Sequence, residues 1–372
     1  MAKLALNSLA LSHFRSHLTA ALECDGRPLA IFGSNGSGKT NILEAVSLFS
    51  PGRGLRRASA EEMTRRPEAL GWKVSGVLET AQGRYEIETW SENGASRQVR
   101  IDGKSTPQIT LASKARVLWL IPSMDRLWIE GAEGRRRFLD RMTLSFFPDH
   151  AEATLTYEKS MRERNRLLKE QVRDAHWYRA LEARMAECGA KIHQNRLAAL
   201  GFLRDAQQQA QTAFPTADLT LVQTEGTLPT TVEDLADALA SSRPRDLASG
   251  RSLVGPHRTD MNGVFQAKGV PAKDCSTGEQ KALLISLILA NARALTEQVG
   301  MPPILLLDEV AAHLDVDRRA ALYDEVCDLG AQAWMTGTEP ALFDSLGSRA
   351  QYIEVKDING LSEAHSIKSP FT

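Results

Sequence analysis

The sequence predicts an α/β protein in which a sheet with a phosphate-binding loop is combined with a mostly helical second lobe. The first observation is the segment GSNGSGKT at residues 33–40, between the strand-like PLAIF and the helix-like NILEAVSLFS. The second is the apolar run ILLL at residues 304–307, which ends in two acids. The third is residues 155–211, a helical stretch without proline. A strand, a glycine loop and a helix in this order are typical of a nucleotide-binding sheet.

The glycine segment has the spacing G-x-x-x-x-G-K-T of a P-loop. Glycines let the backbone curl so that successive N–H groups point at an anion, and the following helix presents its positive dipole end there. Lys39 is expected to reach the β- and γ-phosphates, and the Thr40 hydroxyl suits Mg²⁺. The predicted nucleotide-binding residues here are Gly33, Ser34, Asn35, Gly36, Ser37, Gly38, Lys39, Thr40 and Asn41.

Two acids follow the second strand, Asp308 and Glu309. A carboxylate at the end of a strand beside a P-loop can hold the Mg²⁺ shell, which makes Asp308 a predicted metal and nucleotide ligand. The next carboxylate can polarise an attacking water, so Glu309 is predicted to be catalytic together with Lys39. The alternative is an ordinary strand that ends in surface acids.

Composition limits the classes of function. The 372 residues have a net charge of −1, so any nucleic-acid contact must come from local basic patches. Four separated cysteines form no C-x-x-C pair, which argues against a zinc site or a disulfide framework and favours the reducing cytoplasm. The longest apolar run, residues 282–292, is shorter than the roughly 20 residues that span a bilayer, so no membrane association is expected.

A third motif, STGEQ, begins at Ser276 and precedes a long apolar helix predicted over about 279–298. Ser276 suits the N-cap of this helix, and a nucleotide contact is the other interpretation. With the P-loop and the acids, the order of motifs resembles the ABC-type ATPases. That resemblance implies a signature, formed by Ser276, Gly278 and Glu279, that contacts nucleotide bound by a second subunit. It also implies that AAHLD is the D-loop, ending at Asp315.

The interval of 236 residues between Thr40 and Ser276 is longer than transporter ATPases use and shorter than the coiled-coil insert of SMC proteins. Residues 155–211 offer roughly two helices of up to about 25 residues, without sustained heptads. The segments LALSHFRSH, EGRRRFLDRM, LVGPHRTDM, LLLDEVAAHLD and TGTEP then resemble the RecF family of bacterial DNA replication and repair ATPases. The chain departs from that family at Thr259, which replaces an acid, and at Glu279. It also departs from transporters, because WMTGTE carries threonines where a switch histidine is expected.

The resemblance implies an ATP- and Mg²⁺-dependent homodimer that closes on double-stranded and gapped DNA and opens after slow hydrolysis. It implies RecR, with RecO, as partners in loading RecA at gaps, and it adds Arg15 to the nucleotide site. An SMC-like ATP-binding scaffold without turnover and a soluble ATPase subunit of a transporter are the alternatives. Basic residues that suit DNA phosphates are Arg56, Arg57, Arg65, Arg66, Arg135, Arg136 and Arg137.

The predicted organisation has three parts. Residues 1–118 form the first part of the ATPase head, including an antiparallel hairpin around Gln82-Gly83. Residues 119–255 form the helical lobe. Residues 256–372 return to the head with the signature, the acids and the D-loop.

Overall fold

The computed structural model describes residues 4–223 and 226–371, which divide into two compact units. The first unit contains the chain up to Asp125, the short segment Gln209–Pro215, and the chain from Thr277 onward. The second contains Arg126–Gln208 and Thr216–Ser276. The predicted return to the head at residue 256 differs from this division. The strand Thr259–Phe265 pairs antiparallel with Ala217–Gln223, so backbone hydrogen bonds hold it in the second unit.

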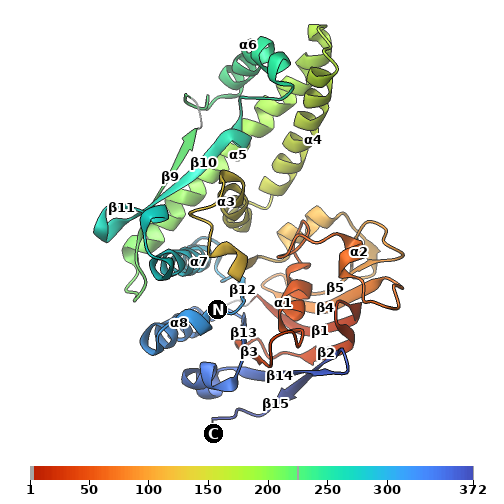
Figure 1. The fold of residues 1–372 in the computed structure, drawn as a ribbon, viewed down its shortest axis with the longest axis vertical. Helices are drawn as coiled ribbons and strands as arrows, with labels where there is room; N and C mark the ends of the chain where they lie inside the picture. The colour runs from red at the N-terminus through yellow and green to blue at the C-terminus, as the bar shows by residue number, and fades with distance from the viewer. Residues whose placement is uncertain (1–3, 224–225, 372) are drawn as a thin grey trace. The chain divides into compact units, whose positions relative to one another are not determined.

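A six-stranded sheet in the order β15-β14-β3-β13-β12-β8 positions the P-loop and the acids (Figure 1). Its strands are β3 (Leu29–Phe32), β8 (Val117–Leu120), β12 (Ile304–Leu307), β13 (Ala333–Gly337), β14 (Gln351–Ile358) and β15 (Leu361–Ile367). All neighbours pair parallel except β14 and β15. The carboxyl ends of β3, β12 and β13 therefore share one edge, where α/β sheets bind ligands.

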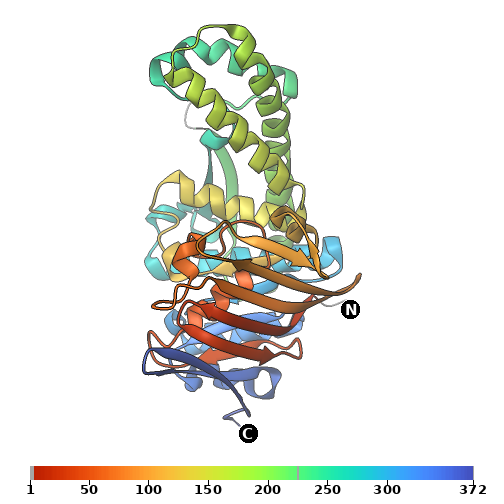
Figure 2. The same ribbon diagram turned by 90° about the vertical axis from the view of Figure 1, so that its right-hand side faces the viewer.

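The second sheet of this unit is antiparallel, in the order β2-β1-β4-β5-β6-β7. Its strands are β1 (Ala5–Phe14), β2 (His17–Glu23), β4 (Trp72–Thr80), β5 (Gly83–Ser91), β6 (Gln98–Ile101) and β7 (Lys104–Ser105). Figure 2 shows its strands side by side. The hairpin expected around Gln82-Gly83 is confirmed, with Thr80 opposite Gly83.

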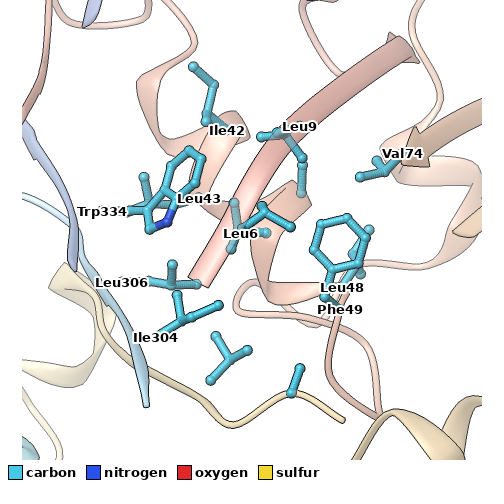
Figure 3. Packing of buried hydrophobic residues seen from close by; sticks show 14 of the residues in the cluster. Leu6, Leu9, Ile42, Leu43, Leu48, Phe49, Val74, Ile304, Leu306 and Trp334 are labelled. Carbon is cyan, nitrogen blue, oxygen red and sulfur yellow. The ribbon is translucent and has the colours of Figure 1, made fainter. Parts of the chain in front are cut away.

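The core of the first unit joins both sheets to helix α1 (Lys39–Ser47). Ile42 and Leu43 from α1 pack with Leu6 of β1 and with Leu306 and Trp334 of the parallel strands (Figure 3). The predicted apolar face of this helix is confirmed, because Ile42, Leu43, Val46 and Phe49 are all buried. Burial of this face fixes the P-loop between the two sheets.

Three further helices of the unit are α2 (Ala60–Met63), α7 (Thr277–Val299) and α8 (Val316–Asp328). Among the described residues, α7 alone is long and apolar enough to cross a membrane, but 72% of its most apolar window is buried inside the protein. That environment is typical of a core helix. Helix α7 begins at Thr277, two residues before the start predicted at about residue 279.

The second unit contains α3 (Ala132–Phe146), α4 (His150–Lys169), α5 (Ala175–Gln209) and α6 (Val232–Ser249), as Figures 1 and 2 show. Helix α5 has 35 residues and is longer than the predicted 25. A three-stranded antiparallel sheet joins β9 (Ala217–Gln223), β10 (Thr259–Phe265) and β11 (Val270–Pro271). Short 3-10 segments in the chain are Gln108–Ser113, Pro122–Met124, Pro256–Arg258, Gln266–Lys268, Ala272–Asp274, Ala311–His313 and Pro340–Arg349.

Candidate nucleotide site

The P-loop connects β3 to α1 and depends on glycine at two close approaches. Gly33 has φ +156° and Gly38 has φ +103°. A Cβ on Gly33 would lie 2.1 Å from the carbonyl oxygen of Val355, and one on Gly38 would lie 2.3 Å from Ser362 Oγ. Side chains at these positions would push the loop away from β14 and β15.

Lys39 is held at the mouth of this loop. Its ammonium donates to the carbonyl oxygens of Gly33 at 2.7 Å and Ser34 at 2.8 Å, and the residue is 4% exposed. Burial lowers the pKa of Lys39, and the nearby carboxylates of Glu309 and Asp308 oppose that shift. The buried hydroxyl of Ser37 has no hydrogen-bond partner among the described residues. Both side chains therefore offer donors that a bound phosphate chain would satisfy.

Asp308 lies at the end of β12 between two threonines. Thr40 Oγ1 donates to Asp308 Oδ1 at 2.9 Å, and Thr336 Oγ1 donates to the same oxygen at 2.7 Å. Thr40 is the second residue of α1, and Thr336 is in β13, next to β12 in the sheet. A hydroxyl and a carboxylate this close together match the oxygen ligands that Mg²⁺ prefers, so the residues fit the metal predicted for them. No group of three or more His, Cys, Asp or Glu suited to a metal occurs in residues 4–223 and 226–371.

Glu309 has an unusual backbone conformation beside this pair. Its φ is +52°, a region that glycine favours, and its N–H donates to Thr336 Oγ1 at 2.9 Å. Thr336 therefore links the carboxylate of one acid to the backbone of the next. Strained backbone of this kind costs on the order of 1–3 kcal/mol and recurs at functional sites.

The AAHLD and STGEQ motifs each lie at the start of a helix. Asp315 is the N-cap of α8 and accepts from the N–H of Arg318 at 2.8 Å. Ser276 comes directly before the first residue of α7, and both Ser276 and Gly278 are exposed, while Glu279 is half-buried. A contact with another subunit requires exposed residues, and Ser276 and Gly278 meet this requirement. The signature role of Ser276, Gly278 and Glu279 stays a prediction.

Arg15 lies beside α1, where it pairs with a buried acid. Its guanidinium makes two hydrogen bonds to the Glu44 carboxylate, at 2.8 and 2.7 Å, and one to the carbonyl oxygen of Glu62 at 2.6 Å. Its φ is +54°. Arg56 donates to Glu44 Oε2 at 3.2 Å and to Asn41 Oδ1 at 2.7 Å.

These side chains border a cavity of about 710 Å³. Its lining is strongly basic and consists of Arg15, Ser16, Asn41, Arg56, Arg57, Ala58, Glu62, Thr64, Arg65, Arg66 and Gly360. The structure thus brings together four arginines that were predicted to contact DNA. Arg65 is mostly buried, and its Nη1 donates to the Ser16 carbonyl oxygen at 3.0 Å.

The other predicted DNA residues lie on α3 and are engaged within the second unit. Arg135 forms a two-bonded ion pair with Asp260 of β10, at 2.8 Å for each bond. Arg136 donates to the Thr259 carbonyl oxygen at 3.3 Å, and Arg137 pairs with Glu133. Of the two arginines that form ion pairs here, Arg137 is the more exposed, with 45% of its side chain accessible against 14% for Arg135.

The GPHR segment, residues 255–258, contacts Tyr157 of α4. Nδ1 of His257 lies 2.7 Å from the Tyr157 hydroxyl, and Nε2 lies 3.0 Å from the Ser252 carbonyl oxygen. Burial lowers the pKa of His257 to about 4, which favours the neutral ring. Gly255 has φ +133°, and a Cβ there would lie 2.1 Å from the Tyr157 hydroxyl. This segment therefore packs against α4.

Sequence reasoning missed two side chains that support the P-loop. Glu44 is fully buried on α1, where an amphipathic pattern predicts a solvated acid. His17 is also buried, and its two ring nitrogens each lie 3.1 Å from a carbonyl oxygen, of Gly38 and of Ser362. No local pattern marks either one, because their partners come from distant segments.

Comparisons with known proteins agree with this geometry. The sequence model of the RecF/RecN/SMC N terminal domain matches residues 5–351. The DNA replication and repair protein RecF of Allorhizobium ampelinum is 46% identical over 367 residues, which cover 95% of this chain and 98% of the relative. RecF of Rhizobium etli is 45% identical over 368 residues, with the same coverage.

Solved structures support the fold. A structure described as the recombination mediator protein RecF with ATP in the RecFOR pathway has a TM-score of 0.82 at 23% identity, covering 98% of both chains. An Smc head domain from Pyrococcus furiosus has a TM-score of 0.58 at 15% identity, covering 98% of this chain and 96% of the other. The fold is therefore the ABC-type ATPase head of RecF and SMC proteins. The family match and the 46% identity together show that this chain belongs to the RecF family, within the RecF/RecN/SMC group.

Proposed function

We propose that this chain is an ATP-controlled DNA clamp that acts in DNA replication and repair. The observation that carries the proposal is the grouping of Thr40, Asp308 and Thr336 beside Lys39, with Glu309 held next to them. P-loop donors, a site for Mg²⁺ and a general base are the parts that ATP hydrolysis needs. The RecF relatives, described as DNA replication and repair proteins, supply the biological setting.

ATP binding begins with the loop itself. Lys39 exchanges its two carbonyl acceptors for the β- and γ-phosphates, and Ser37 gains a partner for its buried hydroxyl. Thr40 and Asp308 would hold Mg²⁺, and the ion would supply positive charge beside the phosphate oxygens. These exchanges favour the nucleotide because the Lys39 ammonium then faces anionic phosphate oxygens in place of neutral carbonyl oxygens.

Hydrolysis uses Glu309 as the general base. Its carboxylate accepts a proton from a water whose oxygen attacks the γ-phosphorus, and ADP leaves with the electrons of the broken P–O bond. Thr336 fixes the position of this residue through the backbone N–H. An intact base argues against a scaffold that binds ATP without turnover.

Dimerisation explains the exposed signature. Ser276 and Gly278 would contact the γ-phosphate held by a second copy, and Asp315 would lie near the same interface. ATP then closes the dimer and hydrolysis opens it. Each closed dimer doubles the basic patches that face one DNA duplex, which compensates for the net charge of −1.

Partners and location follow from the relatives. One solved relative is described as a recombination mediator in the RecFOR pathway, which supports RecR and RecO as partners at gapped DNA. The curated DNA replication and repair relatives support the cytoplasm as the compartment. RecA loading at gaps is the expected outcome of that pathway. Solution sizing with each partner tests whether a complex forms.

The decisive experiment measures binding to one labelled duplex across a salt series with ATP, with ADP and without nucleotide. We expect affinity to rise with ATP and to fall with salt, at a log–log slope of about −0.9 for each phosphate contacted. Lys39→Ala should remove the ATP-dependent rise, since the β,γ-phosphates lose their main cation. Equal affinity in all three nucleotide states of the unmodified protein would refute the clamp.

A further inference from the structure

Two arginines that line the basic cavity beside α1, Arg15 and Arg56, share a buried acid behind them. Glu44 has no exposed side-chain surface, and it pairs with Arg15 at 2.7 Å and with Arg56 at 3.2 Å. A buried carboxylate is costly unless it is paired, so these contacts fix three side chains together. One negative charge between two guanidiniums leaves a net positive charge at the cavity wall.

We propose that Glu44 is a positioning residue that holds Arg15 and Arg56 as a wall for the nucleoside end of bound ATP. The proposal rests on the function proposed above. It adds the part of the ligand that this cavity takes and the residue that sets its geometry.

The direction of α1 identifies the ligand portion. Lys39 at its start serves the β- and γ-phosphates, and the backbone N–H groups of the loop serve the α- and β-phosphates. Asn41 lies two residues further along and lines the cavity. The cavity therefore starts where the phosphate chain ends, and its volume of about 710 Å³ is in the usual range of small-molecule sites.

The wall has the chemistry that a nucleoside needs. Guanidinium planes stack on aromatic rings and donate to ring nitrogens, which suits a purine face and edge. The Arg56 side chain is 39% exposed and is anchored at one end by Asn41 and Glu44, so its remaining donors can face a ligand. Arg15 is fixed more firmly, by Glu44, by the Glu62 carbonyl oxygen and by a backbone bond from its N–H to Met63 at 2.8 Å.

A second set of contacts holds the loop that carries Arg56. Arg97 donates to the carbonyl oxygens of Gly52 at 2.8 Å and Ser50 at 3.2 Å, and Ser47 Oγ accepts from the N–H of Leu55 at 2.9 Å. The segment between α1 and α2 is thus tied down on both sides of Gly54. This preorganisation reduces the entropy lost when a ligand binds.

The test compares ATP with inorganic tripolyphosphate, which has the phosphates but no nucleoside. In calorimetric titrations of the full chain with Mg²⁺, Glu44→Gln should weaken ATP by about tenfold and leave tripolyphosphate unchanged, because one charge-assisted anchor is lost. Glu61→Gln, an exposed acid on α2, is the matched control and should change neither.

Arg56→Ala and the double variant separate positioning from general damage. If Glu44 acts through Arg56, the variant that combines Glu44→Gln with Arg56→Ala should lose no more ATP affinity than the single variant with the larger loss. Arg56→Ala alone removes a partly exposed side chain and keeps the test usable should Glu44→Gln fail to fold.

Three outcomes would overturn the proposal. One is an equal loss of ATP and tripolyphosphate, which would make Glu44 a support of the P-loop only. Another is a double variant whose losses add, and the third is weakened DNA binding with unchanged ATP binding, which would assign the cavity to DNA. Failure of the unmodified protein to bind either phosphate ligand would instead refute the proposed ATP site itself.

Discussion

Replacement of Thr336 by valine separates ATP binding from ATP hydrolysis. The Thr336 hydroxyl donates to Asp308 and accepts from the Glu309 N–H, and the residue is 1% exposed. Valine keeps the branched shape and removes both hydrogen bonds. Asp308 keeps its contact with Thr40, while the backbone of Glu309 loses the bond that holds it at φ +52°.

The size of the effect follows from these two bonds. A hydrogen bond to a charged group contributes about 1.5–3 kcal/mol, and a buried N–H left without a partner costs about 1–3 kcal/mol. Release of Glu309 toward an ordinary φ would recover on the order of 1–3 kcal/mol of strain, so relaxation is favoured. The Glu309 carboxylate then loses the orientation proposed for the general base. We expect kcat to fall about 10- to 100-fold, which corresponds to about 1.4–2.7 kcal/mol of barrier.

ATP affinity should change by less than about threefold, because Thr336 binds no phosphate in the proposed mechanism. Single-turnover hydrolysis gives the rate of the chemical step, and a fluorescent ATP analogue gives affinity. Thr336→Ser restores the hydroxyl and should restore turnover, while the exposed Thr338→Val is a matched control. Normal turnover in Thr336→Val, or equal loss of binding and turnover, would refute this reasoning.

Three further variants test other parts of the molecule. Glu309→Gln should bind ATP and remain a dimer, as solution sizing would report, but hydrolyse it at least about 100-fold more slowly; a normal rate would exclude Glu309 as the base. Ser276→Arg should keep nucleotide binding by each monomer and abolish dimerisation and turnover together; lost monomer binding would mean that Ser276 acts within its own subunit. The pKa of His257, about 4 when folded against 6.5 when unfolded, means that its neutral ring stabilises the fold fully above pH 6.5. That contribution, about 2 kcal/mol for a partly accessible ring, is lost as pH falls toward 4. Urea unfolding should therefore show a smaller acid loss in His257→Gln than in the unmodified protein, and identical pH profiles would contradict it.

The elements that sequence analysis predicted well are those whose signal is local. The P-loop follows from eight neighbouring residues, and the hairpin of β4 and β5 follows from alternation on each side of Gln82-Gly83. The strand β12 and its two acids were predicted from a run of four apolar residues. In each case the residues that decide the structure are close together along the chain.

The division between the two units was predicted less well because it depends on distant pairing. Asp260 and Met261 are in a strand because β10 pairs with β9, about forty residues earlier in the chain. The same strand supplies Asp260 as the partner of Arg135, at a separation of 125 residues. A basic run on a helix gives no indication of such a partner, so solvent, phosphate or a partner protein were the contacts expected for Arg135.

Glu44 shows how a site can lie outside the reach of periodicity. The apolar face of α1 was predicted, and a glutamate between Leu43 and Val46 would ordinarily be a solvated surface residue. Its burial depends on Arg15, which reaches it from the end of β1, and on Arg56 from the loop after α1. Neither arginine alone would compensate a buried charge as well as the two together. The acid is therefore stable inside only when the β1 turn and the loop are both folded against α1. That dependence makes the wall of the basic cavity a product of tertiary structure, and it ties the shape of the cavity to the same helix that begins at Lys39.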